Sequence, residues 1–335
     1  MIRARHLRLA ARFAAHRFRA LHPFEVQAAL LNACNLRCAY CRCPDEQTRV
    51  LTTAQWLEII RGLAALGTMR IKFQGGEPTL RRDFRALCAA ARAAGIVTAV
   101  VTNGLAIAAD PTLLDELDEV VFSLDSPDAA RNDAQRGAGV HAQVTRALDA
   151  ARARRLPTFI NMVVTRGTLG DIDAMLDFCA ARGVGLHAQP VVFGRRYYDD
   201  AARRLAPTRD EIVAMHRQLA AWKRAGRPIM FSAASYEQVT TWADHDRLTT
   251  VSAAPSSCMA GRFYVHLEPN GDVQPCALYE DAAFTPRNAV RDGLEAALRH
   301  VRTHHCGDCS IVYLNERKAL FDLRPRTLLE VLRRG

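Results

Sequence analysis

Cys34-Asn35-Leu36-Arg37-Cys38-Ala39-Tyr40-Cys41 is the stretch that decides how this chain is built. Its cysteines have the spacing C-x3-C-x2-C, so one short loop presents three thiolates. A four-iron cluster takes four ligands, and three thiolates leave one iron open to a ligand that is not protein. The open iron indicates a reactive centre.

Two other interpretations of this loop stay open, a zinc knuckle and a disulfide hairpin. Structural zinc takes four closed ligands, usually as paired C-x2-C groups or as C-x2-C with H-x3-H. The loop offers an asymmetric triple instead, which favours the iron–sulfur interpretation.

A second motif, Gly75-Gly76-Glu77-Pro78, ends an apolar run further along the chain. Together with the cysteine loop it resembles the radical S-adenosylmethionine (SAM) enzymes. In that family the amino and carboxylate groups of SAM chelate the open iron, and the reduced cluster cleaves SAM to a 5′-deoxyadenosyl radical. The resemblance implies a [4Fe-4S] cluster on Cys34, Cys38 and Cys41. Because the family's loop ends at the third cysteine, we interpret Cys43 as a bystander thiol, with a fourth cluster ligand as the alternative.

Apolar runs alternate with helical patterns six times from residue 24 onward. The runs predict strands near 25–33, 69–74, 96–101, 119–124, 158–165 and 185–192. The helical patterns lie near 53–66, 83–94, 111–117, 139–154, 170–182 and 208–225. Such alternation indicates a parallel sheet with helices outside it. We expect an α/β fold with a partial (β/α)6 barrel over residues 24–225, which is also the fold that the resemblance implies.

The polar motifs follow the carboxyl ends of the expected strands, where βα barrels place their chemistry. Glycines let backbone polar groups approach a ligand closely. The resemblance implies that the Gly75–Pro78 rim holds the methionine ammonium of SAM, and that Arg136 pairs with its carboxylate. We expect Tyr40 near the adenine, Ser123 and Asp125 at the ribose hydroxyls, and Asn161 and Val191 near the nucleoside. The other expected cofactor-binding residues are Gly75, Gly76, Glu77, Asn103 and Arg136.

A second cysteine set lies beyond the expected barrel. Cys258 is followed by twelve residues, Gly271, four residues and Cys276, and the string Cys306-Gly-Asp-Cys309 comes later. Asn270-Gly271 predicts a tight hairpin over 262–279. The pattern resembles the twitch or shortened SPASM extension, which implies a second, auxiliary [4Fe-4S] cluster closed by four thiolates. A zinc ribbon, with His304 and His305 nearby, is the alternative.

The expected domains are a basic helical segment over 1–23, the barrel over 24–225, a connecting insertion over 226–257, and a small cysteine-rich auxiliary-cluster domain over 258–335. Two polar residues within the barrel strands are candidate catalytic groups. Lys72 and Gln74 share one strand face, as do His187 and Gln189. A buried lysine is costly unless it is paired or neutral, so Lys72 is either a substrate contact or base, or a salt-bridged structural residue. His187 can equally be a satisfied structural histidine.

The formal net charge of +10 comes mostly from arginine, since lysine occurs only at 72, 223 and 318. We attribute this to composition and expect no nucleic-acid partner, because aromatic residues are not interleaved with a basic patch. Arginines interrupt residues 1–22, which therefore lack the apolar core of a signal peptide, and no run is long enough to span a membrane. The cysteine usage then predicts a cytoplasmic protein. The segment 1–22 is expected to dock on the barrel as an amphipathic helix, with attachment to a membrane surface as the alternative.

The reaction follows from the expected radical and the auxiliary cluster. A closed cluster near the substrate would accept an electron, which favours oxidation of a small molecule. Radical modification of a peptide or protein is the alternative. A flavodoxin- or ferredoxin-type donor would supply the electron that starts the reaction.

Overall fold

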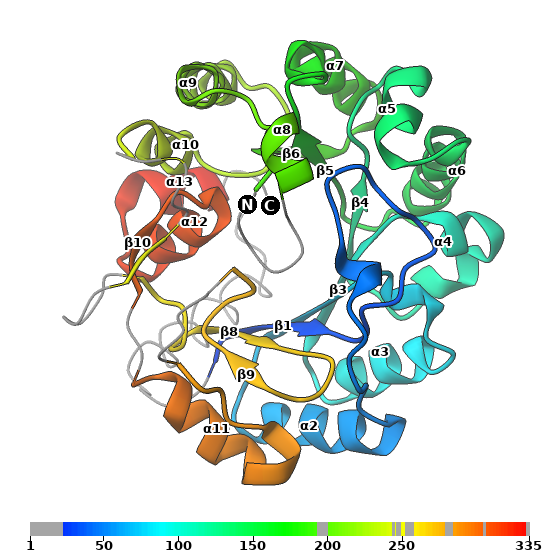
Figure 1. Cartoon of the computed structure of the whole chain (residues 1–335), viewed down its shortest axis with the longest axis vertical. Coiled ribbons are helices and arrows are strands. Elements are labelled where there is room, and N and C mark those ends of the chain that lie inside the picture. Colours follow the sequence, from blue (N-terminus) through cyan, green and yellow to red (C-terminus); the bar gives the residue numbers. More distant parts are fainter. Residues whose placement is uncertain are drawn as a thin grey trace.

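The computed structural model describes residues 23–192, 200–242, 245, 249–251, 258–278, 284–303 and 306–332. The helix expected over 1–22 lies outside this part of the chain, as do His304 and His305. Six parallel strands neighbour one another in chain order, and helices cover the outer face of their sheet (Figure 1). The strands are β1 (Glu25–Ala29), β2 (Arg70–Gln74), β3 (Val97–Thr102), β4 (Glu119–Ser123), β5 (Thr158–Val164) and β6 (Gly185–Pro190). The expected partial barrel is confirmed.

The connecting helices match the sequence pattern except after β3 and β4. Where a helix was expected near 111–117, the structure has a 3-10 turn that follows a short α-helix at 105–109. The helix α5 had no predicted counterpart. The sequence of α5, AARNDAQR, has no apolar stripe, and the helix is begun by the Asp128 side chain, which accepts from the Arg131 N–H at 2.9 Å. The helices are α2 (Thr53–Ala65), α3 (Phe84–Ala93), α4 (Leu105–Ala109), α5 (Ala129–Arg136), α6 (Val140–Ala153) and α7 (Ile172–Arg182), with 3-10 turns at Cys43–Asp45, Pro78–Leu80, Pro111–Leu114 and Leu169–Asp171.

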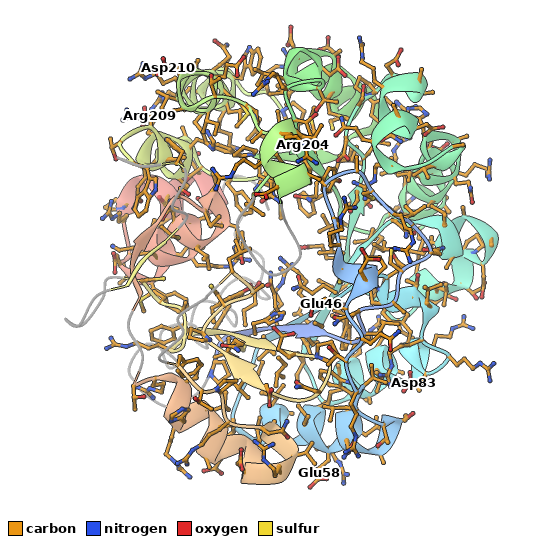
Figure 2. The ribbon with its side chains drawn as sticks, viewed as in Figure 1. Glu46, Glu58, Asp83, Arg204, Arg209 and Asp210 are labelled. Atoms are coloured by element: carbon orange, nitrogen blue, oxygen red, sulfur yellow. The ribbon has the colours of Figure 1, made fainter. Side chains whose placement is uncertain are left out.

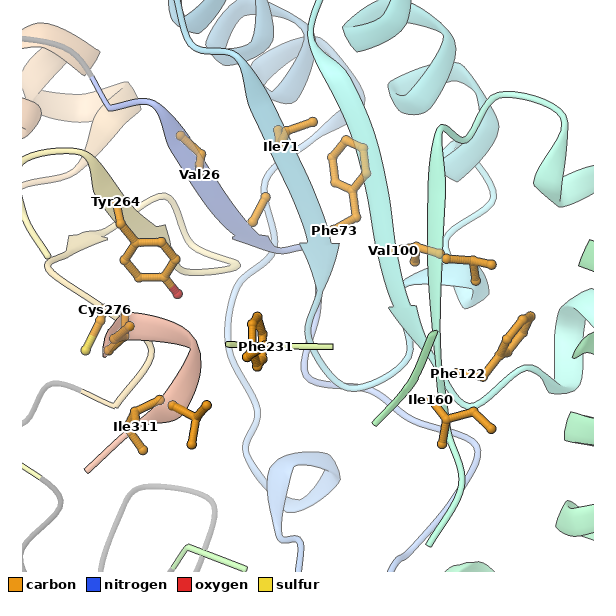
Figure 3. Packing of buried hydrophobic residues seen from close by; sticks show 14 of the residues in the cluster. Val26, Ile71, Phe73, Val100, Phe122, Ile160, Phe231, Tyr264, Cys276 and Ile311 are labelled. Carbon is orange, nitrogen blue, oxygen red and sulfur yellow. The ribbon is translucent and has the colours of Figure 1, made fainter. Parts of the chain in front are cut away.

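Side chains on the strands alternate between the helix-facing core and the inside of the barrel. On β5, Ile160 and Met162 are fully buried in the core, whereas Asn161 and Val163 border the internal cavity. Figure 3 shows part of this core around Phe73, Phe122 and their neighbours. Charged side chains such as Glu58 point outward from the helical ring (Figure 2).

A hairpin extends the barrel sheet beyond β1. It consists of β8 (Tyr264–Leu267) and β9 (Val273–Gln274), which pair antiparallel around the predicted Asn270-Gly271 turn. Gly271 has a φ of +92°, a conformation that favours glycine. Strand β8 pairs in parallel with β1, so the hairpin lies on the side of β1 opposite to β2. The hairpin is confirmed, but its place in the barrel sheet was not predicted.

The rest of the C-terminal region packs around this hairpin and α10 (Figure 1). On α12, Phe321 stacks on Phe263 with ring centroids 4.1 Å apart, and Glu316 accepts from the Ser232 N–H at 3.0 Å. These contacts hold α12 against the segment that leads into β8 and against the start of α10. Its elements, with those that precede it, are α8 (Asp200–Leu205), α9 (Arg209–Arg224), α10 (Ala233–Thr240), β7 (Thr249–Val251), a π-helical turn at Ala289–Gly293, α11 (Leu294–Val301), β10 (Cys306–Cys309), α12 (Val312–Phe321) and α13 (Pro325–Leu332).

Candidate active site

A cavity of about 300 Å³ lies inside the barrel, toward the carboxyl ends of the strands. Every strand from β1 to β6 contributes to its lining, as do the cysteine loop and the C-terminal region. The predicted site residues that border it are Cys34, Cys38, Tyr40, Cys41, Lys72, Gly75, Gly76, Glu77, Asn103, Ser123, Arg136, Asn161 and His187. The fold therefore brings residues from distant parts of the chain around one space.

The three loop cysteines face this cavity together. Burial raises the pKa of Cys41 to about 11, and the nearby Cys38 and Cys34 thiols add to the rise. The Cys34 sulfur accepts from the Leu36 N–H at 3.4 Å. Mutually close, partly buried thiols fit a [4Fe-4S] cluster, because iron replaces their protons and backbone N–H groups stabilise the ligating sulfur.

Cys43 is buried beside the loop and makes its own contact. Its thiol donates to the Asn32 carbonyl at 3.6 Å. This contact agrees with a bystander role, which stays a prediction.

The two glycines of Gly75–Pro78 are required by the neighbouring backbone. A Cβ on Gly75 would lie 2.2 Å from the Leu31 carbonyl oxygen, and one on Gly76 would lie 2.3 Å from the Ala33 carbonyl oxygen. The Gly76 N–H donates to the Leu31 carbonyl at 2.7 Å. The glycines thus allow the segment after β2 to press against the start of the cysteine loop, a role that the sequence did not reveal.

Glu77 is buried and accepts four hydrogen bonds. Its Oε1 accepts from the Thr79 N–H at 3.1 Å, the Thr79 hydroxyl at 2.5 Å and the Thr102 hydroxyl at 2.8 Å, and its Oε2 accepts from the Asn103 N–H at 2.7 Å. Burial raises its pKa, although these donors oppose the rise. Glu77 therefore ties the ends of β2 and β3 together at the rim of the cavity.

Arg136 and Asp125 form a buried ion pair with Tyr40. Arg136 Nη1 donates to Asp125 at 3.1 and 3.0 Å, and the Tyr40 hydroxyl donates to Asp125 at 2.7 Å. Burial lowers the pKa of Arg136, but Asp125 and Tyr40 more than offset this and hold it well above its ordinary value. Asp125, expected at the ribose, is fully buried and engaged here.

Val191 lies outside the cavity in a small apolar cluster with Cys38 and Tyr40. Its neighbour Val192 borders the cavity instead. The expected cofactor-binding positions thus divide into residues on the cavity wall and residues that hold the wall in place.

Lys72 and His187 border the cavity from β2 and β6. The Lys72 ammonium lies 3.8 Å from Glu25 Oε1, and burial lowers its pKa to about 8 although Glu25 opposes this. Burial and the Lys72 charge lower the pKa of His187 to about 3, so its ring is neutral. The His187 ring packs edge-on against the Phe231 ring, with the ring centroids 4.8 Å apart.

A comparison of the sequence with known proteins agrees with this geometry. A family model described as "Radical SAM superfamily" matches residues 29–179. The PqqA peptide cyclase of Streptomyces rochei is 32% identical over 285 residues, which cover 80% of this chain and 73% of that protein. The PqqA peptide cyclase of Gluconobacter oxydans is 30% identical and is covered to the same 73%.

The chain belongs to the radical SAM superfamily. It is a radical SAM enzyme, and the matched region contains the cysteine loop, the Gly75–Pro78 motif and the Tyr40–Asp125–Arg136 network. A bound [4Fe-4S] cluster and SAM are therefore its expected cofactors, and the cavity wall fits both.

Solved structures show the same fold. Streptococcus suis SuiB bound to S-adenosylmethionine aligns with a TM-score of 0.65 at 18% identity, covering 89% of this radical SAM enzyme and 73% of SuiB. The structure of anSMEcpe with AdoMet and a peptide aligns with a TM-score of 0.62 at 16% identity, covering 84% of this chain and 81% of that one. Both alignments extend past the barrel, so the C-terminal region has structural counterparts as well.

The auxiliary cysteines of this radical SAM enzyme lie next to the barrel. Cys258, Cys276 and Cys309 are buried, and only the backbone of Cys306, in β10, is described. Burial, with Cys276 and Cys309 adding to it, raises the pKa of Tyr313, which borders the cavity. Cys276 and Cys309 therefore lie near one side chain of the cavity wall.

Several cavity residues escaped the sequence analysis. Gln27 borders the cavity from β1, and the Tyr264 hydroxyl donates to it and lies 3.0 Å from the Tyr313 hydroxyl. A polar residue within the apolar run of β1 was a usable signal for Gln27. Tyr313 had no such signal, because its position depends on how α12 packs.

Among the described residues, no helix is long and apolar enough to cross a membrane.

Proposed function

We propose that this radical SAM enzyme modifies a peptide or protein by abstracting a hydrogen atom from it. The observation that carries the proposal is the 30 to 32% identity to PqqA peptide cyclases over about four fifths of the chain. Solved relatives of the same fold were crystallised with precursor peptide SuiA and with a short peptide, which adds support. The small-molecule oxidation favoured by the sequence has no such support.

The chain's own residues would act as follows. Cys34, Cys38 and Cys41 would hold the [4Fe-4S] cluster, which supplies the electron that cleaves SAM when a flavodoxin- or ferredoxin-type donor reduces it. Glu77, Asn103, Ser123, Asn161 and the glycine rim would position SAM, with Asp125, Arg136, Tyr40 and Val191 holding that wall. Lys72 and His187 would contact the substrate. Cys258, Cys276, Cys306 and Cys309 would hold an auxiliary [4Fe-4S] cluster.

The reaction balances if the peptide loses two hydrogen atoms. One would be transferred to the 5′-deoxyadenosyl group that SAM supplies, which would leave as 5′-deoxyadenosine. The other would leave as a proton and an electron, and an oxidised auxiliary cluster held by Cys258, Cys276, Cys306 and Cys309 would accept that electron. The product then carries a new internal bond or double bond.

The test uses anaerobically reconstituted enzyme, SAM, a chemical reductant and short precursor-like peptides encoded near the gene, with the PqqA peptide as a further probe. We expect a peptide that is lighter by two hydrogens in mass spectrometry, with one 5′-deoxyadenosine formed for each product. Conversion of small alcohols or sugars, with every peptide unchanged, would overturn the proposal.

A further inference from the structure

One part of the cavity lining holds none of the expected cofactor contacts. The expected SAM residues are joined to the cysteine loop, where the Asn103 side chain donates to Asn35 at 2.8 Å and Arg136 donates to Tyr40 at 2.7 Å. Elsewhere the cavity is bordered by β6 and by segments that follow the barrel. We call this second part the closing wall, which consists of His187, Gln189, Met230, Phe231 and Tyr313.

The closing wall begins with a contact along β6. The Met230 N–H donates to the Leu186 carbonyl at 2.8 Å, so the segment before α10 lies beside that strand. The Phe231 ring then packs edge-on against the His187 ring, with the ring centroids 4.8 Å apart. The strand and this segment therefore present an imidazole, a phenyl ring and a thioether to the same cavity.

Helix α12 brings the second aromatic ring of the closing wall. The Ser232 N–H, one residue after Phe231, donates to Glu316 Oε2 at 3.0 Å, which holds the segment against α12. Tyr313 lies about one turn before Glu316 on that helix, and its hydroxyl lies 3.0 Å from the Tyr264 hydroxyl. The Phe231 and Tyr313 rings thus reach the cavity from two segments that are in contact.

Each lysine, arginine and carboxylate that borders the cavity in the described structure already has partners from the protein. Lys72 is ion-paired with Glu25 at 3.8 Å, and Arg136 is ion-paired with Asp125 at 3.0 Å. Glu77 accepts four hydrogen bonds at the ends of β2 and β3, away from the closing wall. A charged ligand at the closing wall would therefore find no cation or carboxylate that lacks a partner.

The closing wall itself is neutral. Burial and the Lys72 charge lower the pKa of His187 to about 3, so its ring is uncharged at neutral pH. Burial raises the pKa of Tyr313, so its phenol keeps its proton. The other members are an amide, a thioether and a phenyl ring. An ionised side chain placed against this wall would lose water without gaining a counter-charge, which is unfavourable.

We propose that the closing wall is a subsite for one side chain of the substrate, and that this side chain is neutral and aromatic. Aromatic rings gain from edge-on or offset contacts with other rings, and a thioether packs favourably against a ring, so Phe231, Tyr313 and Met230 suit such an occupant. The proposal rests on the proposed function, since it makes the occupant part of a peptide. The same wall rejects acidic and basic side chains.

The methionines of the chain make binding at this subsite measurable. Enzyme labelled with [methyl-13C]methionine gives separate methyl signals, and Met230→Leu identifies the signal from the closing wall. Met162 and Met175 are fully buried in the hydrophobic core and serve as internal references. The readout needs no turnover.

The probes are N-acetylphenylalanine amide and its 4-carboxy and 4-aminomethyl analogues, which share the ring and differ in charge. Each is titrated at neutral pH into reconstituted enzyme, with and without saturating SAM. We expect the neutral probe to shift the Met230 signal and to leave both references in place. The charged analogues should bind more weakly by roughly tenfold or more, because the wall offers no counter-charge. SAM should not displace the neutral probe.

Phe231→Ala tests the ring that the probe would contact. Loss of this buried phenyl surface should weaken the neutral probe by roughly tenfold. Phe178→Ala is the matched control, since Phe178 lies on α7 with the Arg182 guanidinium 3.6 Å from its ring centroid. The comparison of the three probes in the wild type does not depend on the folding of either variant.

Four results would overturn the proposal: no Met230 shift with the neutral probe, equal binding of the three probes, tighter binding of a charged analogue, or displacement of the neutral probe by SAM. The last would assign the closing wall to the cofactor. Selective binding of the neutral probe by an enzyme that leaves every peptide unchanged would keep the subsite and refute the proposed function. Modified peptides without any selectivity among the probes would do the reverse.

Discussion

Arg136 Nη1 lies 3.0 Å from Asp125 Oδ2, and both side chains are buried beneath the cysteine loop. The Tyr40 hydroxyl joins the pair, accepting from Arg136 and donating to Asp125, each at 2.7 Å. The Ala39 N–H also donates to the Gln135 carbonyl at 2.8 Å. The loop that carries the three cysteines is thus fastened to the end of β4 and to α5 by a charged network.

Breaking this ion pair should unfold the region around the loop. Arg136→Gln leaves Asp125 buried without its cation, and we expect a loss of about 3–5 kcal/mol in the free energy of unfolding. Adding Asp125→Asn should recover part of that loss. Urea denaturation of the apoprotein measures both, with Arg131→Gln as the control, because Arg131 is exposed and its pair with Asp171 is worth about 1 kcal/mol or less. Equal stability of Arg136→Gln and the control would contradict the network's role.

Glu77→Ala should weaken SAM binding while cluster content stays nearly intact. Loss of a charge-assisted hydrogen bond costs about 1.5–3 kcal/mol, which is roughly tenfold to a hundredfold in affinity. The four donors that Glu77 now satisfies add a loss of stability. A SAM titration with the exposed Glu58→Ala as control checks this, and unchanged affinity would exclude Glu77 from the SAM site.

Replacing Cys34, Cys38 and Cys41 with Ala should remove one of two clusters. Reconstituted wild type should hold about eight iron atoms and the triple variant about half of them. The variant should make no 5′-deoxyadenosine after reduction. The control is Cys88→Ala, since Cys88 is a core thiol on α3. Continued SAM cleavage by the triple variant would show that the first loop has been misassigned.

Replacing Cys306 and Cys309 with Ala tests the auxiliary cluster. SAM cleavage should remain measurable, because the first cluster is intact, but the peptide should keep both hydrogens, because its second electron has no acceptor. Stoichiometric zinc in the wild type would favour the zinc ribbon instead. Near wild-type conversion by the double variant would make the second set structural.

Glu25 should make the free energy of unfolding depend on pH in the acidic range. Burial raises its pKa, but Arg317, Lys72 and Arg70 lower it by more, to about 2 from 4.5 in the unfolded chain. Since the folded pKa is the lower one, the stabilisation is present above pH 4.5 and is lost as the pH falls toward 2, about 3 kcal/mol in all. Glu25→Gln should flatten the stability profile in that window, and exposed Glu58→Gln should not. Identical acid profiles of Glu25→Gln and the wild type would refute this.

The barrel, the three clustered thiols and the order of motifs along the rim could all be predicted from the sequence. Period-2 apolar runs between helical patterns predict βα units, and parallel strands bring their carboxyl ends to one edge whatever the details of packing. Cys34, Gly75, Asn103 and Ser123 could therefore be expected together before any coordinates. The polar helix α5, without an apolar stripe, escaped this logic.

The contacts of individual side chains became clear only in the folded protein. Asp125 and Arg136 were expected at the cofactor, and the fold also makes each the buried ion-pair partner of the other. Glu77 accepts hydrogen bonds from Thr102 and Asn103 at the end of β3. Gly75 and Gly76 lack a Cβ that would clash with the backbone at the start of the cysteine loop. Lys72 and Arg317 share the carboxylate of Glu25, and Arg317 is brought to it by α12 from the far end of the chain. Pairings between residues hundreds of positions apart depend on packing, and no local pattern encodes them.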